Sequence, residues 1–333
     1  MNDPREPRAT SASTMTALVL HADCGRHDTG WGHPEHQGRL PAILNALSQD
    51  TPALLTHVLQ HEAVPASELQ LQRVHTPEHI ARVRAAAELA QRTGRSVHLD
   101  VDTVVSVASW DAACAAAGCA IDATRLVLER RCQSAFALTR PPGHHATADR
   151  AMGFCLFNNA AVAARVAQAE HDIDRVLVVD WDVHHGNGTQ DIFYNDPRVY
   201  YLSLHLAGHY PGTGWAAERG IGAGLGTTRN VPLEHGTPAA EYLRAFDQAL
   251  IAALAEFDPQ LTIVSAGFDC LAGDPLGGLL LEPADLYTMT RTVAERTGSP
   301  LVIVLEGGYA PARVGHGVVA VFRALTSGPG TTF

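Results

Sequence analysis

The sequence predicts an α/β fold with a central, mostly parallel β-sheet that is flanked by helices on both faces. Two observations support this prediction. Short runs of apolar and β-branched residues alternate with longer stretches of helical character throughout residues 16–325. The short runs are apolar at every position instead of at every second one, which is typical of parallel strands that are buried on both faces.

Six apolar runs are predicted to be strands: residues 17–20, 134–138, 176–179, 199–204, 261–265 and 301–305. Five stretches are predicted to be helices: residues 77–90, 109–129, 159–170, 238–256 and 283–297. The first of these has Thr76 as its N-cap and Pro77 at its first helical position, a combination that favours a helix start. Strands joined by helices imply right-handed crossovers, and such sheets bind ligands beyond the carboxyl ends of their strands.

No linker, repeat or change of composition divides residues 16–325, so we treat them as a single domain. Residues 1–15 are polar and are expected to be a flexible N-terminal leader. Residues 326–333 are expected to be a C-terminal tail.

The composition excludes several classes of protein. With 333 residues, 46% hydrophobic and 18% charged, the chain is typical of a soluble globular protein with a large core. No apolar run approaches the ~20 residues of a membrane span, and the first fourteen residues lack the apolar centre of a signal peptide. We therefore expect no membrane partner.

The net charge indicates which kinds of partner the chain can bind, and the cysteine content indicates its cellular compartment. The formal net charge is -11, which disfavours binding to nucleic-acid phosphates and suits a cationic partner better. The six cysteines include no CxxC pair, so a zinc knuckle or a disulfide framework is not indicated. Reduced thiols fit a cytoplasmic location.

Polar clusters follow four of the predicted strands. They are RPPGHH at 140–145, DWDVHHGNG at 180–188, GFD at 267–269 and EGGY at 306–309. Because the carboxyl ends of parallel strands meet at one edge of a sheet, we expect the four clusters to converge there.

The second cluster has the spacing of a metal site. In an extended segment side chains alternate between faces, so Asp180, Asp182 and His184 would point the same way while the intervening Trp181 and Val183 pack in the core. Two carboxylates on one side would repel each other without a cation.

Asp269, from another strand end, would complete a set of three ligands with Asp182 and His184. Two carboxylates and an imidazole with an open fourth position are typical of a catalytic and not of a structural site. The donor set suits Zn²⁺, and also Fe²⁺ or Co²⁺. The alternative is that each residue only caps a helix or satisfies a loop.

The adjacent His144 and His145 offer a general base, which needs an orienting partner. Asp180, if it is not itself a ligand, would hold one imidazole, and Asn187 would hold the other. Tyr309 follows two glycines that allow close approach of the backbone, and its hydroxyl would donate to a developing oxyanion. Taken alone, Gly-Gly-Tyr is more typical of an ordinary turn.

Taken together, these residues resemble the histone deacetylase family, within the arginase-deacetylase superfamily. The matching stretches occur in order over nearly the whole domain: HPE at 33–35, Arg39, VHTPE at 74–78, RPPGHHA at 140–146, MGFCLFNN at 152–159, DWDVHHGNGTQDIFY at 180–194, SLH at 203–205, YPGTG at 210–214, GFDCLAGDP at 267–275 and EGGY at 306–309. The resemblance implies an arginase/deacetylase-like fold.

The resemblance also implies a zinc-dependent amidohydrolase and assigns roles to its residues. Zn²⁺ would bind Asp182, His184 and Asp269. The remaining catalytic residues would be His145 as general base, His144 paired to Asp180 as auxiliary, Asn187 as partner of the other histidine, and Tyr309 as oxyanion donor.

A substrate tunnel is implied in the same way. Phe154 and Tyr210 correspond to its aromatic walls, and the Gly153 carbonyl to the acceptor of the substrate amide N–H. Leu276 stands where a polyamine-selective relative carries a gatekeeper Glu. Asp102 corresponds to a rim carboxylate that grips a peptide backbone, with an ordinary solvated carboxylate as the alternative.

Further correspondences are less specific. Arg39 would line an acetate exit channel or form an ordinary salt bridge, and Cys155 is expected to pack beside the tunnel. The potassium sites of the family map to Asp180, Asp182, His184, Ser203 and Leu204, and to Phe193 and Val199.

Three positions depart from patterns that are common in the family. Asn187 stands where class I members carry Asp, and Glu306 precedes the two glycines, so the pattern resembles the class II and bacterial branch. Tyr210 replaces a tunnel residue that is often Phe.

Three functions therefore stay open. The first is removal of acyl groups, chiefly acetyl, from lysine side chains of peptides or proteins. The second is hydrolysis of a small acetylated polyamine, which the apolar Leu276 disfavours. The third is a non-catalytic acyl-lysine binding module. A dinuclear ureohydrolase is disfavoured, because Leu271 stands where a second metal-binding Asp is needed. The oligomeric state is left open.

Overall fold

The computed structural model describes residues 15–54 and 57–327. Within them, an eight-stranded sheet has the order β2-β1-β5-β10-β9-β6-β7-β8, and all its neighbouring strands are parallel. The strands are β1 Thr16–Leu20, β2 Val58–Glu62, β5 Ser134–Ala137, β6 Val176–Asp180, β7 Val199–Leu206, β8 Thr228–Leu233, β9 Leu261–Ala266 and β10 Leu301–Leu305. The predicted parallel α/β fold is confirmed.

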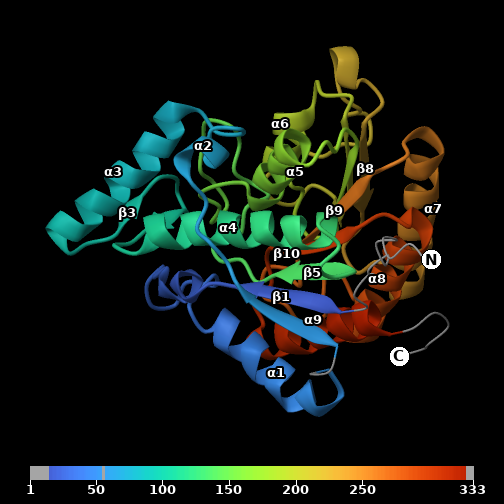
Figure 1. Ribbon diagram of the computed structural model, residues 1–333, viewed down its shortest axis with the longest axis horizontal. Coiled ribbons are helices and arrows are strands. Elements are labelled where there is room, and N and C mark those ends of the chain that lie inside the picture. Colours follow the sequence, from blue (N-terminus) through green and yellow to red (C-terminus); the bar gives the residue numbers. More distant parts are fainter. Residues whose placement is uncertain (1–14, 55–56, 328–333) are drawn as a thin grey trace, which may run out of the picture.

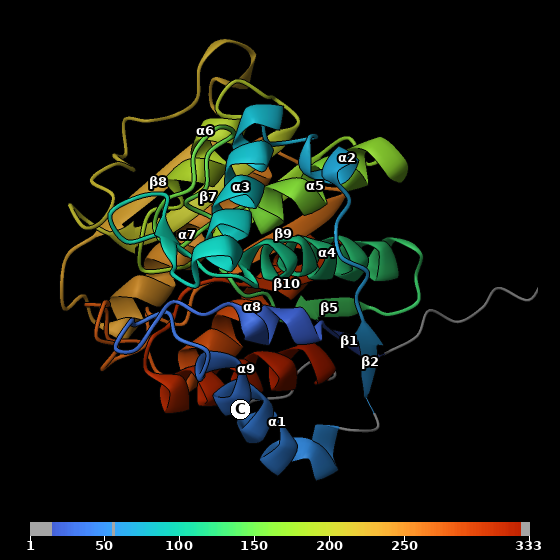
Figure 2. The same cartoon turned by 90° about the vertical axis from the view of Figure 1, so that its left-hand side faces the viewer.

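Helices cover the sheet on both faces (Figure 1). They are α1 Arg39–Leu54, α2 Glu68–Leu71, α3 Pro77–Thr93, α4 Ser109–Leu128, α5 Asn159–Glu170, α6 Asn187–Phe193, α7 Ala239–Glu256, α8 Pro283–Thr297 and α9 Pro311–Thr326. Helices α1, α9, α8 and α7 pack successively against one another, and α3, α4, α5 and α6 form a second group. Figure 2 shows these two groups on opposite sides of the sheet.

Smaller elements complete the described chain. The 3-10 helix η1 Ala22–Arg26 precedes α1, and η2 Gly222–Gly224 precedes β8. A two-stranded hairpin pairs β3 Val97–His98 with β4 Val104–Val105 in antiparallel orientation. It stands apart from the main sheet.

The six predicted strands and five predicted helices are all present, with ends that shift by at most a few residues. The predictions missed the edge strands β2 and β8 and the helices α1, α2, α6 and α9. Helix α9 runs to Thr326, one residue into the predicted tail. Residues 1–14 of the predicted leader and residues 328–333 of the predicted tail lie outside the described residues.

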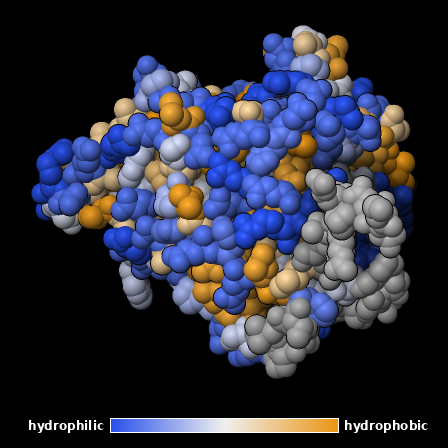
Figure 3. Space-filling view, in the orientation of Figure 1, coloured by the Kyte–Doolittle hydropathy of each residue, from blue (hydrophilic) through white to orange (hydrophobic). Residues whose placement is uncertain are grey.

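The core lies between the central strands and the two helix groups. All residues of β5, β6, β9 and β10 are buried. Figure 3 shows the surface of the molecule in the orientation of Figure 1. Polar residues cover most of this surface, and apolar residues are scattered among them. Among the described helices, none has the length and apolar character that crossing a membrane requires.

The sheet order decides where the polar clusters lie. Strands β5, β10, β9 and β6 are consecutive in the middle of the sheet, and each cluster directly follows one of these four strands. The clusters therefore meet at the carboxyl edge of the sheet centre, as the sequence predicts.

Candidate metal centre

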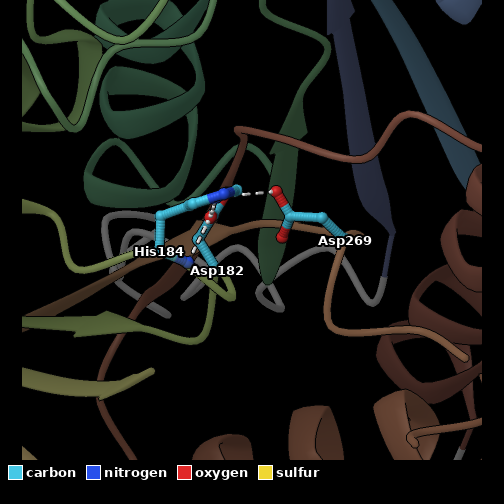
Figure 4. A group of neighbouring side chains, drawn as sticks. All are labelled: Asp182, His184 and Asp269. Atoms are coloured by element: carbon cyan, nitrogen blue, oxygen red, sulfur yellow. Dashed lines mark hydrogen bonds and ion pairs between the residues drawn. The ribbon is translucent and has the colours of Figure 1, made fainter. Parts of the chain in front are cut away.

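Three buried side chains converge beyond the ends of β6 and β9. Asp182, His184 and Asp269 each offer a ligand atom, and the three atoms lie within 4.8 Å of one another. His184 Nδ1 is 2.9 Å from Asp182 Oδ1 and 3.3 Å from Asp269 Oδ2. In Figure 4 dashed lines join His184 to the carboxylates of both Asp182 and Asp269.

The backbone fixes one oxygen of each carboxylate. Asp182 Oδ2 accepts the Gly307 N–H at 2.9 Å, and Asp269 Oδ1 accepts the Val183 N–H at 2.9 Å. Asp269 Oδ2 is buried and accepts no hydrogen bond. A buried carboxylate oxygen without a donor is costly, and a cation at this point would satisfy it.

The glycines around the carboxylates leave room for such a cation. A Cβ at Gly307 would lie 2.1 Å from Asp269 Oδ2 and 2.7 Å from Asp182 Oδ2. A Cβ at Gly267 would lie 2.2 Å from Asp182 Oδ2. Two carboxylate oxygens and one imidazole nitrogen around a space that only glycine keeps free fit Zn²⁺ by number and type of donor.

The electrostatics of the three groups favour a bound cation. Burial, followed by the charge of Asp182, raises the pKa of Asp269 to about 7. Burial lowers the pKa of His184, but its interactions with the carboxylates of Asp182 and Asp269 prevail and raise it to about 10. The two carboxylates thus favour a cation between them.

Asp180 has different hydrogen-bond partners from Asp182 and His184. Its Oδ2 lies 3.0 Å from His144 Nδ1 and accepts the Tyr201 hydroxyl at 2.9 Å. Its Oδ1 accepts the Asp182 N–H at 3.1 Å. Asp180 therefore contacts a histidine of the β5 loop and does not belong to the group of three.

The two histidines after β5 differ in their partners and in their basicity. Their rings lie 4.0 Å apart, and His145 Nδ1 is 2.8 Å from Asn187 Oδ1. Burial lowers the pKa of His144, but Asp182 and Asp180 outweigh it and raise that pKa to about 10. Burial and the charges of the neighbouring histidines lower the pKa of His145 well below its usual value.

A neutral His145 has one protonated ring nitrogen and one free lone pair. Because Asn187 Oδ1 accepts a hydrogen bond, Nδ1 of His145 carries the proton and Nε2 keeps the lone pair. The arrangement can take up a proton at Nε2, as a general base must.

Tyr309 stands four residues beyond the end of β10 and is almost fully buried. Its ring contacts the guanidinium of Arg39 and, edge-on, the ring of Phe154. Burial, and next the charge of Asp269, raise the pKa of Tyr309 well above its usual value. Its phenol therefore stays protonated and can donate a hydrogen bond.

The residues assigned to a tunnel lie beside this group. The Tyr210 ring meets the His145 ring edge-on at 5.0 Å. A Cβ at Gly153 would lie 2.5 Å from the His145 ring and 3.0 Å from Tyr210, so glycine is needed between them. Phe154 has φ +68° and donates its N–H to Thr103 Oγ1 at 3.1 Å.

Leu276 and Asp102 lie in loops that touch these residues. The Leu276 carbonyl is 3.0 Å from His209 Nε2, and the His209 ring stacks on His184 at 5.0 Å. The Asp102 carbonyl is 3.3 Å from His33 Nε2. The sequence analysis missed His209 and Tyr201, although both lie next to quoted motifs, because nothing in their spacing distinguishes them.

Arg39 and Cys155 are both buried beneath the site. Arg39 donates to the Gly308 carbonyl at 2.6 Å and to Glu35 at 3.0 Å, so it forms a salt bridge and also borders the Tyr309 loop. Cys155 packs with its thiol 3.3 Å from the Gly153 carbonyl.

The residues matched to potassium sites are not all brought to this edge. Ser203 and Leu204 lie in β7, where Ser203 pairs with Asp180. Val199 begins β7 and Phe193 ends α6, so both lie toward the amino end of the strand. Potassium binding stays a prediction.

Comparisons with known proteins agree with this geometry. A family model described as Histone deacetylase domain matches residues 33–325. The Histone deacetylase-like amidohydrolase of Pseudomonas aeruginosa is 41% identical over 298 residues, which span 88% of this chain and 76% of the relative. The Polyamine deacetylase HDAC10 of Homo sapiens is 37% identical over 327 residues, which span 94% of this chain but 48% of the relative.

A solved structure is similar over nearly the full length. The crystal structure of the HDA15 HD domain aligns with a TM-score of 0.90 and 38% sequence identity. The alignment covers 97% of this chain and 91% of that one.

Proposed function

Because the chain belongs to the histone deacetylase family, we propose that it is a zinc-dependent hydrolase that removes acyl groups, chiefly acetyl, from lysine side chains of peptides or proteins. The observation that carries this proposal is the group of Asp182, His184 and Asp269, buried beside a neutral histidine and a protonated tyrosine. A non-catalytic binding module would not need the last two.

The chain's own residues account for each proton in the reaction. Asp182, His184 and Asp269 would hold the zinc ion. When bound, zinc polarises a carbonyl and makes water more acidic. His145 Nε2 accepts a proton from the attacking water, and the Tyr309 hydroxyl donates to the carbonyl oxygen as negative charge develops there.

The second half of the reaction returns that proton. The amide C–N bond breaks, and the leaving amine takes a proton from the imidazolium of His145. His144, whose Nδ1 lies 3.0 Å from Asp180 Oδ2, stabilises the negative charge nearby. The products are a free amine and a carboxylate.

Removal of the metal tests this proposal directly. We expect the purified protein to hydrolyse an acetyl-lysine peptide, to lose this activity after treatment with a chelator and to regain it when Zn²⁺ is added back. Turnover that persists without metal would refute the zinc-dependent mechanism. Binding of acetylated peptide without any product would favour the binding module.

Replacement of Tyr309 by Phe tests the oxyanion donor. The phenol oxygen is lost while the ring contacts with Arg39 and Phe154 remain, so we expect kcat to fall ~10²-fold or more with unchanged metal content. Tyr194, at the end of α6, provides the matched control Tyr194→Phe, for which no change is expected. An unchanged kcat in Tyr309→Phe would contradict the assigned role.

Hydrolysis of an acetylated polyamine is the second candidate, because a relative named as a polyamine deacetylase is 37% identical. Leu276 disfavours it, because an apolar side chain cannot attract a second ammonium. The test is the ratio of kcat/KM for acetylputrescine and for an acetyl-lysine peptide. A clear preference for acetylputrescine would replace the first candidate with the second.

A further inference from the structure

A pocket outside the proposed tunnel opens beside Tyr309. Its volume is about 610 Å³, and it is lined by residues 28–34 and 36–38 of the segment between η1 and α1. Among the described residues, Tyr309 is its one lining residue from another segment. No step of the proposed reaction uses the side chains of this pocket other than Tyr309.

The segment between η1 and α1 is hydrogen-bonded to a buried arginine at both ends and is exposed to solvent at its tip. The buried guanidinium of Arg140 donates to the His27 carbonyl at 2.6 Å and to Glu35 Oε1 at 2.7 Å. At the tip, Gly30 and Gly32 have φ values of +92° and +83°, and the Trp31 side chain between them is fully exposed. The fold thus presents an indole to solvent on a loop with fixed ends.

The pocket is connected to the wall of the proposed tunnel through His33. The His33 ring meets the Phe154 ring edge-on at 4.8 Å. Its Nε2 lies 3.3 Å from the carbonyl of Asp102. A substrate whose acyl-lysine enters beside Phe154 would therefore have its neighbouring residues close to this pocket.

The pocket and its rim carry negative charge without a matching cation. Asp28 lines the pocket, and its Oδ1 accepts the Gly30 N–H at 3.0 Å. The Asp102 carboxylate accepts the Thr103 hydroxyl at 3.0 Å. Unlike Glu35, which pairs with Arg39 and Arg140, neither carboxylate forms an ion pair with an arginine within the described part of the chain.

An exposed indole face next to an unpaired carboxylate is a combination that suits a cation. The face of Trp attracts ammonium and guanidinium groups, and a carboxylate adds an ion pair. The net charge of -11 supports the same choice of ligand over the whole molecule.

We propose that the pocket of Asp28 and Trp31 binds a cationic side chain next to the acylated lysine, so that the preferred substrate is a basic polypeptide segment. This inference rests on the proposed function. A small acylated diamine would leave the pocket empty, because the ammonium of acetylputrescine reaches only as far as the Cα of an acylated lysine.

Two acetyl-lysine peptides test the proposal, identical except that one carries arginine and the other citrulline beside the acetyl-lysine. Citrulline keeps the size of arginine and removes its charge. We expect KM to be about fivefold lower for the arginine peptide, with similar kcat. The arginine should be placed before and after the acetyl-lysine in turn.

Two variants identify the pocket as the source of this preference. Trp31→Ala removes the indole, and Asp28→Asn removes the charge while its amide oxygen still accepts the Gly30 N–H. Each is expected to bring the KM ratio toward one without changing turnover of acetylputrescine. Leu69→Ala, an exposed residue of α2 outside the pocket, is the control that should keep the preference.

The outcomes separate this inference from the function on which it rests. Equal KM values for the two peptides in the unmodified protein, or a preference that survives in Trp31→Ala, would overturn the inference. If the zinc-loaded protein hydrolyses no acylated amine, the proposed function fails instead. Fluorescence anisotropy of labelled peptides then still decides the inference, because equal affinities for the arginine and citrulline peptides would refute it.

Discussion

Glu306 is a buried carboxylate that joins three of the strand ends at the site. Its Oε2 accepts the N–H groups of Gly143 at 2.6 Å and His144 at 3.1 Å, and its Oε1 accepts the Ser265 hydroxyl at 3.0 Å. Burial raises its pKa to about 7. The carboxylate thereby orients the loop that carries the two histidines.

Two substitutions of Glu306 distinguish the effect of its hydrogen bonds on kcat from the effect of its charge. In Glu306→Gln the amide oxygen can still accept the two N–H groups while the amide nitrogen donates to Ser265, so we expect kcat to stay within a few-fold. In Glu306→Ala the N–H groups lose their acceptor, and kcat should fall ~10-fold or more with little change in KM. Ser265→Ala is the control, because it removes the hydroxyl that donates to Oε1 but leaves both N–H groups bound to Oε2. Equal losses in the Gln and Ala variants would show that the charge is what matters.

Individual side chains followed the alternation of an extended strand only in part. Trp181 and Val183 are buried in the core, as the alternation predicts. Asp180, Asp182 and His184 do lie near one another, but Asp180 turns to His144 and Tyr201. Which of two nearby carboxylates joins the group of three depends on partners from other strands, which a local pattern does not contain.

At the scale of elements, the turn after β10 carries a steric requirement that can be tested. An alanine Cβ at Gly307 would overlap the carboxylates of both Asp182 and Asp269. We expect Gly307→Ala to push these carboxylates apart and to lower zinc affinity ~10-fold or more, measured as zinc content after dialysis against a metal buffer.

The control for this prediction is Gly25→Ala. A Cβ at Gly25 would meet no atom within 4 Å, so zinc content should not change. Full zinc affinity in Gly307→Ala would contradict the proposed position of the ion.

The elements that the sequence analysis missed share physical reasons. Strand β2 lies at a sheet edge and has no fully buried residue, so its sequence is partly polar. Strand β8, at the other edge, contains Pro232, which the middle of a sheet would not tolerate. Helix α9 contains Gly315, which weakens a helical pattern but lets the helix approach Ala42 and Ala46 of α1. For β2 and β8 the edge position, and for α9 the packing against α1, outweighs local propensity.

At the scale of the whole molecule, buried histidines make stability depend on pH. Burial lowers the pKa of His27 to about 4 and that of His75 to about 3, from an ordinary value of 6.5. Both are neutral in the folded chain, while the unfolded chain takes up protons below pH ~6.5. Above that pH the two histidines do not lower the free energy of unfolding. As the pH falls below it, each lowers the free energy of unfolding, by about 2 kcal/mol at pH 5.

Denaturant unfolding of the metal-free protein between pH 8 and 5 measures this effect. His75→Gln removes one titrating group, so its free energy of unfolding should rise relative to that of the unmodified protein as the pH falls from 8 to 5. His98→Gln is the control, because this histidine is exposed. An unchanged slope in His75→Gln would contradict the prediction.

The composition of the whole chain gives a further prediction. The sequence contains no lysine, so all 24 basic residues counted as Lys plus Arg are arginines. A proposed lysine deacylase of this composition cannot be its own substrate. After incubation with acetyl phosphate we expect no Nε-acetyl group by mass spectrometry and unchanged activity, under conditions that acetylate a lysine-containing control protein. Loss of activity under these conditions would contradict the prediction.

By itself, the sequence determined the class of the fold, most of the central strands and helices, and the four polar clusters at strand ends. Continuous apolarity and helix signals are local properties that a chain segment carries with it. The tertiary structure alone decided that β5, β10, β9 and β6 are neighbours, so that Gly307 contacts Asp182 across 125 residues. It also decided the partners of Glu306 and His209. Contacts between distant segments depend on which strands pair and how crossovers pack, and no local period records that choice.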